Sequence, residues 1–379
     1  MTINKATAFE SASRIVVKIG SGVLTEDNGL NIRAIRSISK QISGLLDKGL
    51  EVILVSSGAM ASGTKRAGLL KRPEDTPGRQ AVAAIGQAGL ILEYEKSFAR
   101  HNKKVAQILL TSEDLSNRKR YLNSRNTVLK LLSWGFLPII NENDTVAVEE
   151  IRFGDNDQLS ASITLLMDAD LLINLTDIEG LYNKDPRQFS DARLIHVVSE
   201  ISKATEKMAD AIPGALGAGG MLSKIKAAKK VTAAGVPMII AKGEEPHILY
   251  KLFANETYGT FFVPKAKKMA LRKCWIAFTT KPKGTIKIDE GAAIAVLKKG
   301  KSLLPIGIIE VEGDFKVGAS VEFATVKSIL GTGLVNYSSA DIRKIMGLKS
   351  DEIKGLIGYK PYDEVIHRNN LAITSECEL

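Results

Sequence analysis

Short apolar runs alternate with longer amphipathic stretches through roughly the first two thirds of this chain. Strands that alternate regularly with helices predict a mostly parallel sheet with helices on both faces. We therefore expect an open α/β sheet sandwiched by helices. The runs expected to be strands are rich in Ile, Val and Leu, and they lie at Arg14 to Ile19, Glu51 to Val55, Val105 to Leu110, Leu137 to Ile140, Leu171 to Leu175 and Val236 to Ala241.

The pattern changes after Phe262, where the elements become shorter and glycine becomes frequent. Such spacing predicts a small β-rich barrel with one or two helices. We expect a first domain over 1–263, a linker over 264–281 and a β-rich domain over 282–372. The candidate strand segments of the second domain are Gly284 to Ile286, Leu304 to Ile308 and Val317 to Phe323.

Composition narrows the class of protein. The chain has 379 residues, of which 45% are hydrophobic and 25% charged, as expected for a globular protein. No apolar run approaches the roughly 18 residues of a membrane span, and residues 1–14 lack the apolar core of a signal peptide. We expect a cytoplasmic protein without membrane association. Cys274 and Cys377 have no spacing typical of a metal site or a disulfide framework.

Charge is distributed unevenly. The formal net charge is +10, and residues 264–379 hold 19 Lys and Arg against 13 Asp and Glu. A basic tail permits contact with RNA or another polyanion. A charge excess of this size is more often an ordinary solvated surface.

Two clusters of acids and amides stand out, Asn141 to Asp144 and Gly154 to Asp157. The first follows a predicted strand directly, and open α/β sheets bind their ligands at the carboxyl ends of strands. So many acceptors and amides in a short segment favour a polar ligand or cations, because unpaired buried polar groups are costly. Two ordinary turns rich in Asn and Asp remain the alternative.

Two further segments combine lysine with glycine, as a phosphate site requires. Lys18 to Gly22 places a lysine at the end of the first strand, and Gly214 to Lys224 places a glycine-rich loop before a predicted helix, Lys224 to Ala234. The alternatives are a snorkelling lysine and a mobile loop. The segment Gly58 to Lys65 only resembles a Walker loop, because one residue separates its second glycine from the lysine.

The absence of histidine from the motifs above bears on the acceptor of a transferred phosphate. A carboxylate acceptor is already ionised at pH 7 and needs no base, whereas a hydroxyl acceptor usually does. The four histidines lie outside every motif above, so lysines without histidine fit a carboxylate or phosphate nucleophile. Asp157 would then hold the two lysines through ion pairs.

Six motifs occur in the order typical of the amino-acid kinase superfamily, and the set resembles most closely its glutamate 5-kinase (gamma-glutamyl kinase) family. The resemblance covers residues 14–262, and residues 282–368 resemble a PUA domain. The motifs are Lys18 to Ser21, Leu54 to Ala59, Ile140 to Asp144, Gly154 to Asp157, Leu175 to Asp177 with Gly180 to Tyr182, and Gly219 to Lys224.

The resemblance implies transfer of the γ-phosphate of ATP, with Mg²⁺, to the side-chain carboxylate of L-glutamate, giving L-glutamyl 5-phosphate for proline biosynthesis. It implies no metal ligand set of the protein's own. The implied catalytic residues are Lys18, Lys224 and Asp157; the implied glutamate site is Ser57, Gly58, Asn141, Asp144 and Asn156; the implied nucleotide site is Lys18, Gly20, Ser21, Thr176, Asp177, Ala218, Gly219, Gly220, Met221, Leu222, Ser223 and Lys224.

The resemblance also implies feedback inhibition by proline, a homo-oligomer (dimer or tetramer) and a hand-off of product to glutamyl-phosphate reductase. Gly22 replaces a serine that is frequent in the family, and Ala218 replaces a threonine. Alternatives are another enzyme of the superfamily, such as an aspartate, acetylglutamate or nucleoside-monophosphate kinase, or an RNA-binding protein that acts through its PUA-like tail.

Overall fold

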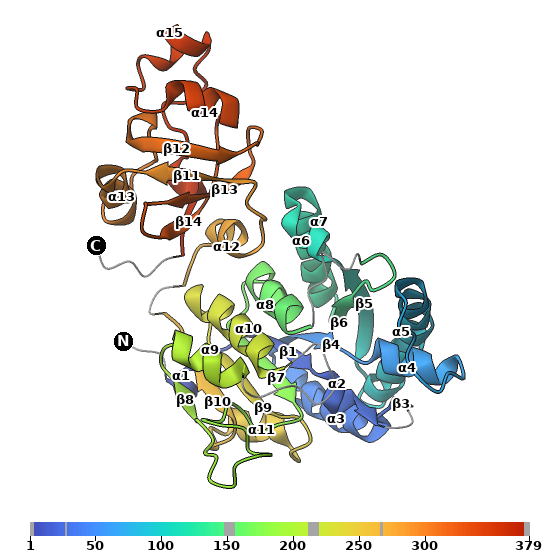
Figure 1. Cartoon of the computed structure of the whole chain (residues 1–379). Helices are drawn as coiled ribbons and strands as arrows, with labels where there is room; N and C mark the ends of the chain where they lie inside the picture. The colour runs from blue at the N-terminus through green and yellow to red at the C-terminus, as the bar shows by residue number, and fades with distance from the viewer. Residues whose placement is uncertain (1–3, 27–28, 148–155, 211–219, 266–267, 375–379) are drawn as a thin grey trace. The chain divides into compact units, whose positions relative to one another are not determined.

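The structure, a computed structural model, describes residues 4–26, 29–147, 156–210, 220–265 and 268–374. The chain divides into two compact units, Met1–Lys268 and Met269–Leu379. Each unit has a sheet of its own (Figure 1). In the part of the chain that the structure describes, no helix combines the length and the apolar character needed to cross a membrane.

An eight-stranded sheet forms the centre of the first unit, in the order β5-β6-β4-β1-β7-β9-β10-β8. All six predicted runs are strands, and they are parallel to one another. The strand β10 is antiparallel to β9, and β8, at the edge of the sheet, pairs with β10. The strands are β1 Arg14–Ile19, β4 Glu51–Ser56, β5 Lys104–Leu110, β6 Phe136–Glu142, β7 Leu171–Thr176, β8 Val197–Val198, β9 Met238–Lys242 and β10 Thr260–Phe262; β2 Thr25–Glu26 and β3 Gly29–Leu30 form a separate pair.

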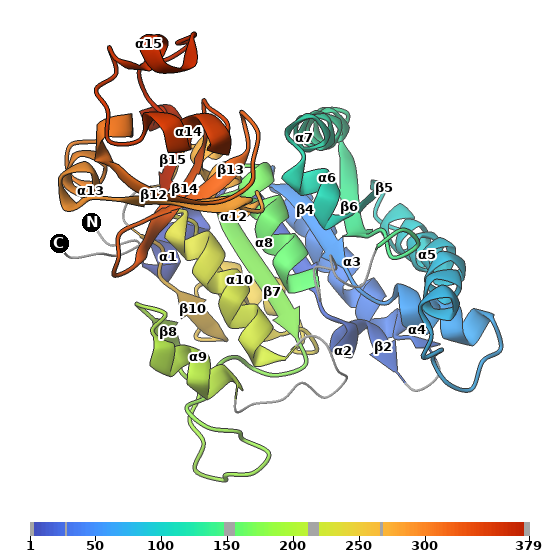
Figure 2. The ribbon, with the colours of Figure 1, turned by 45° about the horizontal axis from the view of Figure 1, so that its top comes forward.

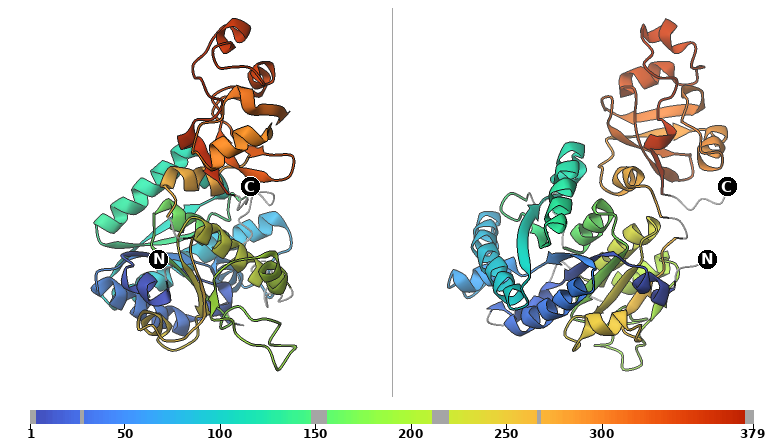
Figure 3. Two further views of the ribbon diagram at one scale, coloured as in Figure 1. Left: turned by 90° about the vertical axis from the view of Figure 1, so that its left-hand side faces the viewer. Right: turned by 180° about the vertical axis from the view of Figure 1, so that it is seen from behind.

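Helices cover both faces of this sheet, as the alternating pattern predicts (Figures 1 and 3). One face carries α3 (Ile32–Asp47) and α11 (Ile248–Phe253), and the other carries α8 (Asn156–Leu166) and α10 (Met221–Ala233). Figure 2 shows α8 and α10 side by side over β7. The remaining helices of this unit are α1 Lys5–Glu10, α2 Ser21–Leu24, α4 Ala59–Arg66, α5 Thr76–Ala99, α6 Ser112–Ser116, α7 Arg118–Ser133 and α9 Lys203–Asp210.

The two faces of β1 differ in character. Ile15, Val17 and Ile19 belong to an apolar core cluster shared with residues of α3, α5 and α11. Side chains alternate between the faces of a strand, so Lys18 emerges on the opposite face, beneath α8 and α10. The alternation along β1 therefore places the buried side chain of Lys18 on the face opposite this apolar cluster.

The second unit has a five-stranded sheet in the order β12-β11-β13-β14-β15. The described residues of this unit contain four α-helices, more than the one or two expected. The elements are α12 Leu271–Phe278, β11 Gly284–Ile288, α13 Glu290–Leu297, β12 Ile308–Gly313, β13 Ser320–Ala324, β14 Ile329–Leu334, α14 Ser339–Ile345, α15 Ile353–Ile357 and β15 Leu371–Ile373.

Two expectations for this region differ from the structure. Leu304 to Ile308 was expected to be a strand, but Pro305–Gly307 forms a short 3₁₀ helix and β12 begins only at Ile308. Proline lacks the N–H group that a sheet ladder needs, which explains the late start. The segment 264–281, expected to be a linker, contains α12, which packs on β14 and β15. Cys274 is buried in that helix, and Cys377 lies outside the described residues.

Candidate active site

Three elements bring charged side chains together at the carboxyl edge of the central strands. Lys18 is the penultimate residue of β1, Asp157 lies in the first turn of α8, and Lys224 lies in the first turn of α10. The first turns of α8 and α10 therefore lie at the same edge as the end of β1. The structure thus assembles residues that are far apart along the chain.

The side chains of Lys18, Asp157 and Lys224 form one ion cluster. Lys18 Nζ donates a hydrogen bond to Asp157 Oδ1, and Lys224 Nζ lies 3.2 Å from Asp157 Oδ2. The exposed fractions of the side chains are 4%, 0% and 7% for Lys18, Asp157 and Lys224. Within these three buried side chains, two cations lie beside one anion.

The environment keeps Asp157 ionised. Burial by itself would raise the pKa of Asp157, but the positive charges of Lys18 and Lys224 and hydrogen bonds from Lys18 and Asn174 outweigh it. The net effect lowers the pKa below its ordinary value. The carboxylate therefore stays negative and cannot serve as a proton donor near neutral pH.

A fourth side chain, Asn174 of β7, contacts the same carboxylate. Its Nδ2 donates to Asp157 Oδ1 at 2.8 Å, and its backbone lies beside Lys18 in the parallel pairing of β1 with β7. Asn174 is completely buried. Sequence reasoning missed it, although a single amide in the apolar run Leu171 to Leu175 was a usable signal.

An amide and hydroxyl cluster adjoins the ion cluster, because Asn156 precedes Asp157 on α8. Asn156 Nδ2 lies 2.9 Å from Ser56 O, from Ser57 Oγ and from Asn141 Oδ1. Its own Oδ1 is buried and has no hydrogen-bond partner among the described residues. Three of the residues predicted to hold glutamate, Ser57, Asn141 and Asn156, are thus in direct contact.

Helix α5 supports this cluster from outside the predicted motifs. Gln87 Oε1 accepts a hydrogen bond of 2.9 Å from Asn141 Nδ2. Tyr94 OH lies 2.8 Å from Ser56 Oγ, and burial raises the pKa of Tyr94 well above its ordinary value. Neither residue was predicted, because no local motif marks a polar contact on an amphipathic helix.

The turn after β4 brings its backbone close to β1. Ser57 N donates to Ile19 O at 3.2 Å, and Gly58 has a φ of 106°, which favours glycine. Helix α4 begins immediately afterwards, so the segment that resembles a Walker loop is helical. Ser57 and Gly58 are therefore presented at the same edge as Lys18.

The loops after β1 and β7 meet at the residues predicted to border the nucleotide. Gly20 N donates to Leu175 O at 2.9 Å. A Cβ atom on Gly22 would lie 2.9 Å from the Cβ of Asp177, so glycine permits this close approach. Thr176 Oγ1 donates to Asp177 Oδ1 at 2.8 Å. Ser21 is the first residue of α2, next to these contacts.

The predicted nucleotide loop is described in part. Gly220 precedes α10 in an extended conformation and offers no side-chain cap to the first amides of the helix. Ser223 O accepts a hydrogen bond of 3.1 Å from Gln158 Nε2 of α8, which joins the two helices. Met221 and Leu222 complete the first turn of α10. Ala218 and Gly219 lie outside the described residues, as do Gly154 and Asp155.

Asp144 lines a separate cavity of about 440 Å³. Arg72 and Arg79 supply positive charge there, and Gln80 of α5 donates to Ala147 O at 3.4 Å. Gln80 and Gln87 are seven residues apart, so they lie on one face of α5 about 10 Å apart. The other lining residues are Met60, Pro73 and Glu74.

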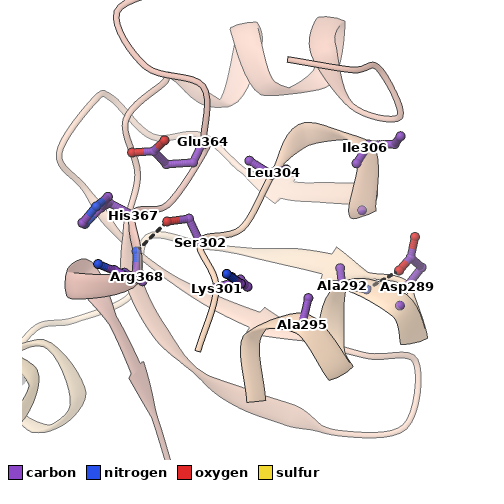
Figure 4. A pocket seen from close by; sticks show the side chains of 12 residues that line it. Asp289, Ala292, Ala295, Lys301, Ser302, Leu304, Ile306, Glu364, His367 and Arg368 are labelled. Atoms are coloured by element: carbon purple, nitrogen blue, oxygen red, sulfur yellow. Dashed lines mark hydrogen bonds between the residues drawn. The ribbon is translucent and has the colours of Figure 1, made fainter. Parts of the chain in front are cut away.

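The C-terminal unit has its own cavity of about 740 Å³, lined by residues of α13, of the segment 301–307 and of the segment 364–368 (Figure 4). Its charged lining residues are two acids, Asp289 and Glu364, and two bases, Lys301 and Arg368, and its apolar part includes Leu304 and Ile306. Figure 4 shows the hydrogen bond from Arg368 N to Ser302 Oγ, which is 3.0 Å long. The remaining lining residues are Gly291, Ala292, Ala295, Ser302, Gly307 and His367.

Comparison with known proteins matches both units. The model of the amino acid kinase family matches residues 13–242, and the model of the PUA domain matches residues 284–357. The glutamate 5-kinase of Syntrophus aciditrophicus is 48% identical over 374 residues, which are 98% of this chain and 97% of that protein. The glutamate 5-kinase of Caldanaerobacter subterraneus is 49% identical over 367 residues, 96% of this chain and 99% of that protein. The glutamate 5-kinase of Geobacter sulfurreducens is 49% identical over 367 residues, which are 96% of this chain and 98% of that protein.

Proposed function

This chain belongs to the amino acid kinase family, within its glutamate 5-kinase group, and we propose that it phosphorylates the side-chain carboxylate of L-glutamate with ATP. The product is L-glutamyl 5-phosphate, and the reaction is the first step of proline biosynthesis. The observation that carries the proposal is the convergence of Lys18 and Lys224 on Asp157 at the carboxyl edge of the sheet. About half of the residues are identical to those of the named relatives, and the matches cover nearly all of both chains, which supports the same substrate.

The reaction needs placement and charge more than proton transfer. A side-chain oxygen of glutamate attacks the γ-phosphorus, the bond to the β–γ bridging oxygen breaks, and ADP leaves. Glutamate is already ionised at pH 7, so no base is required. Lys18 and Lys224 stabilise the negative charge that spreads over the transferring group, and Asp157 keeps their ammonium groups near one point.

Two polar regions would hold glutamate: the amide and hydroxyl cluster around Asn156, and the cavity lined by Asp144. Asn156 carries a buried amide oxygen without a partner among the described residues, which would accept a hydrogen bond from the substrate ammonium. Ser57 and Gly58 offer hydrogen-bond donors to a carboxylate. Asp144 and Arg79 border the cavity near α5 and supply the opposite charges that a zwitterionic amino acid needs.

We propose that Mg²⁺ enters with ATP. Mg²⁺ usually keeps several water ligands and binds through substrate phosphates rather than in a cage made by the protein. The ion would supply additional positive charge on the phosphate oxygens. Thr176, Asp177 and the first turn of α10 would border the nucleotide.

A panel of acceptors tests the substrate. With ATP, Mg²⁺, glutamate and hydroxylamine, we expect γ-glutamyl hydroxamate and an equal amount of ADP, because acyl phosphates acylate hydroxylamine. Aspartate, N-acetylglutamate and UMP serve as comparison acceptors. ADP release with one of these and none with glutamate would reverse the assignment.

Three proposals concern partners. Proline would compete with glutamate for an overlapping site, which glutamate saturation curves at several proline concentrations would test.

The chain would form a dimer or tetramer, and the exposed apolar residues Ile85 and Leu92, two turns apart on α5, support a self-association surface. Light scattering would measure the mass. Glutamyl-phosphate reductase would receive the product, because acyl phosphates hydrolyse readily.

The cavity of the C-terminal unit supports a second candidate function, binding of RNA. Lys301 and Arg368 would contact phosphate, and Leu304 would contact a base, although Asp289 and Glu364 oppose an anion. Filter binding of RNA to the whole chain over a salt series tests this function, with a Lys301→Ala, Arg368→Ala double variant as control. Retention that is absent, or equal in the two proteins, would contradict it.

A further inference from the structure

We propose that Asn174 is a positioning residue for the ion cluster: it fixes the plane of the Asp157 carboxylate so that one oxygen faces each lysine. The inference rests on the proposed function. It concerns a residue that none of the predicted motifs contains. Asn174 lies in the middle of β7, between Ile173 and Leu175, in a strand whose other residues are buried as well.

Its location is costly for an amide. Asn is depleted in strands, and a buried polar group loses free energy unless it is hydrogen-bonded. Asn174 is completely buried, and its Oδ1 has no partner among the described residues. The single bond that the described residues provide to its side chain is the donation from Nδ2 to Asp157 Oδ1. Because packing would be served better by an aliphatic residue, the value of this amide lies in that bond.

The register of the sheet gives the bond its direction. In the pairing of β1 with β7, Lys18 is directly opposite Asn174, so both side chains emerge on the face that α8 covers. Asp157 therefore receives donors from the sheet at Oδ1 and from α10 at Oδ2. Two donors at Oδ1 restrict rotation of the carboxylate about its Cβ–Cγ bond, which keeps Oδ2 toward Lys224.

A neutral donor is the suitable group for this purpose. A third cation would increase the buried charge, and a carboxylate would cancel the positive excess that a phosphoryl group needs. The amide of Asn174 instead orients Asp157 without changing the net charge of the ion cluster. Its effect on the reaction is exerted through Lys18 and Lys224, whose separation follows from the orientation of Asp157.

The test compares two variants of nearly the same size. Asn174→Leu removes the donor, and we expect kcat to fall roughly 10- to 100-fold, as for the loss of a hydrogen bond to a charged group. The KM for glutamate should stay unchanged, because Asn174 does not contact the substrate. Asn174→Asp replaces the donor by an acceptor and cancels the excess charge, so its kcat should be lower still.

A control and a second readout separate the possible outcomes. Asn336→Leu removes a comparable bond of 3.0 Å, from Asn336 Nδ2 to Glu364 O in the other unit, and should leave kcat unchanged. Loss of the Asn174 bond should also bring the pKa of Asp157 closer to its ordinary value, so acid unfolding of Asn174→Leu should begin at higher pH. That shift is measurable even if glutamate is not the substrate. A normal kcat in Asn174→Leu, or a raised KM at normal kcat, would overturn the inference.

Discussion

Two clusters of three charges, one in each unit, have the same plan with the signs exchanged. In the ion cluster, one buried carboxylate lies between two lysines. In the C-terminal sheet, Lys287 of β11 lies 2.9 Å from Glu310 and 2.6 Å from Glu312 of β12. These three side chains are exposed by 32%, 52% and 51%, so water solvates them. The hydrogen bonds that Lys287 donates to Glu312 and Glu310 raise the pKa of Lys287.

The difference shows when a charge cluster indicates function. Exposed ion pairs contribute little because water competes for both partners, and an unbalanced charge among them costs little. A buried excess charge is expensive, so it persists where something compensates for it. In the ion cluster two cations lie beside one anion, next to an amide cluster. We propose that a transferring phosphoryl group supplies further negative charge there.

The largest effect should follow from neutralising the centre of the buried cluster. Asp157→Asn leaves two buried lysines without their anion, and we expect a loss of stability of about 3–5 kcal/mol. Chemical denaturation would measure it. A nonhydrolysable ATP analogue should stabilise the variant more than the wild type, because its phosphates replace the lost charge. An unchanged denaturation midpoint would contradict the account of the cluster.

The next effect concerns one lysine of the cluster. Lys224→Ala should lower kcat by about 10²–10³-fold, because a cation that acts on the transition state is lost. Lys226→Ala is a matched control, since Lys226 is exposed on the same helix. Steady-state kinetics of both variants, with thermal melts to verify folding, would decide. Equal turnover in the two variants would remove Lys224 from the mechanism.

The pH dependence of the unfolding free energy should show the contribution of the ionised Asp157 carboxylate. A carboxyl group whose pKa is lowered by folding stabilises the protein above its unfolded pKa of about 3.9 and loses that contribution as pH falls. The difference in unfolding free energy between wild type and Asp157→Asn should therefore be constant from about pH 5 to 8 and shrink below about pH 4. A difference that grows on acidification would have the wrong sign.

A smaller effect is expected beside the cluster. Asp144→Ala should raise the KM for glutamate by about tenfold, the equivalent of one charged contact of about 1.4 kcal/mol. The value of kcat should change little, because Asp144 lies in the cavity near α5 and not in the ion cluster. Glutamate saturation curves would measure both. An unchanged KM would exclude Asp144 from the substrate site.

The smallest effect is expected at the exposed cluster. Lys287→Ala should change neither turnover nor the denaturation midpoint measurably, because water replaces the lysine as a partner of the two glutamates. A marked loss of stability in this variant would show that exposure does not decide the value of a charge cluster here.

Local patterns in the sequence predicted two of the three elements that carry the ion cluster, β1 and α10, but not α8. The six apolar runs became the parallel strands, and the helix predicted from Lys224 starts three residues earlier, at Met221. The strands β8 and β10, with two and three residues, were too short to show a pattern.

What escaped prediction depends on contacts between distant segments. The contacts of Gln87 with Asn141 and of Asn174 with Asp157 form only where α5 and β7 pack against the polar clusters. The 3₁₀ helix at Pro305 was mistaken for a strand because apolar residues flank it on both sides. Periodicity identifies elements, whereas the partner of a single buried amide follows only from the register of the sheet.

The most direct test of the central claim is a crystal structure with glutamate and a nonhydrolysable ATP analogue bound. We expect Lys18 Nζ and Lys224 Nζ both to lie within about 2.7–3.2 Å of oxygens on the γ-phosphate, with the glutamate side-chain carboxylate on its other side. A γ-phosphate that contacts neither lysine, or lysines that point into separate cavities, would contradict the account.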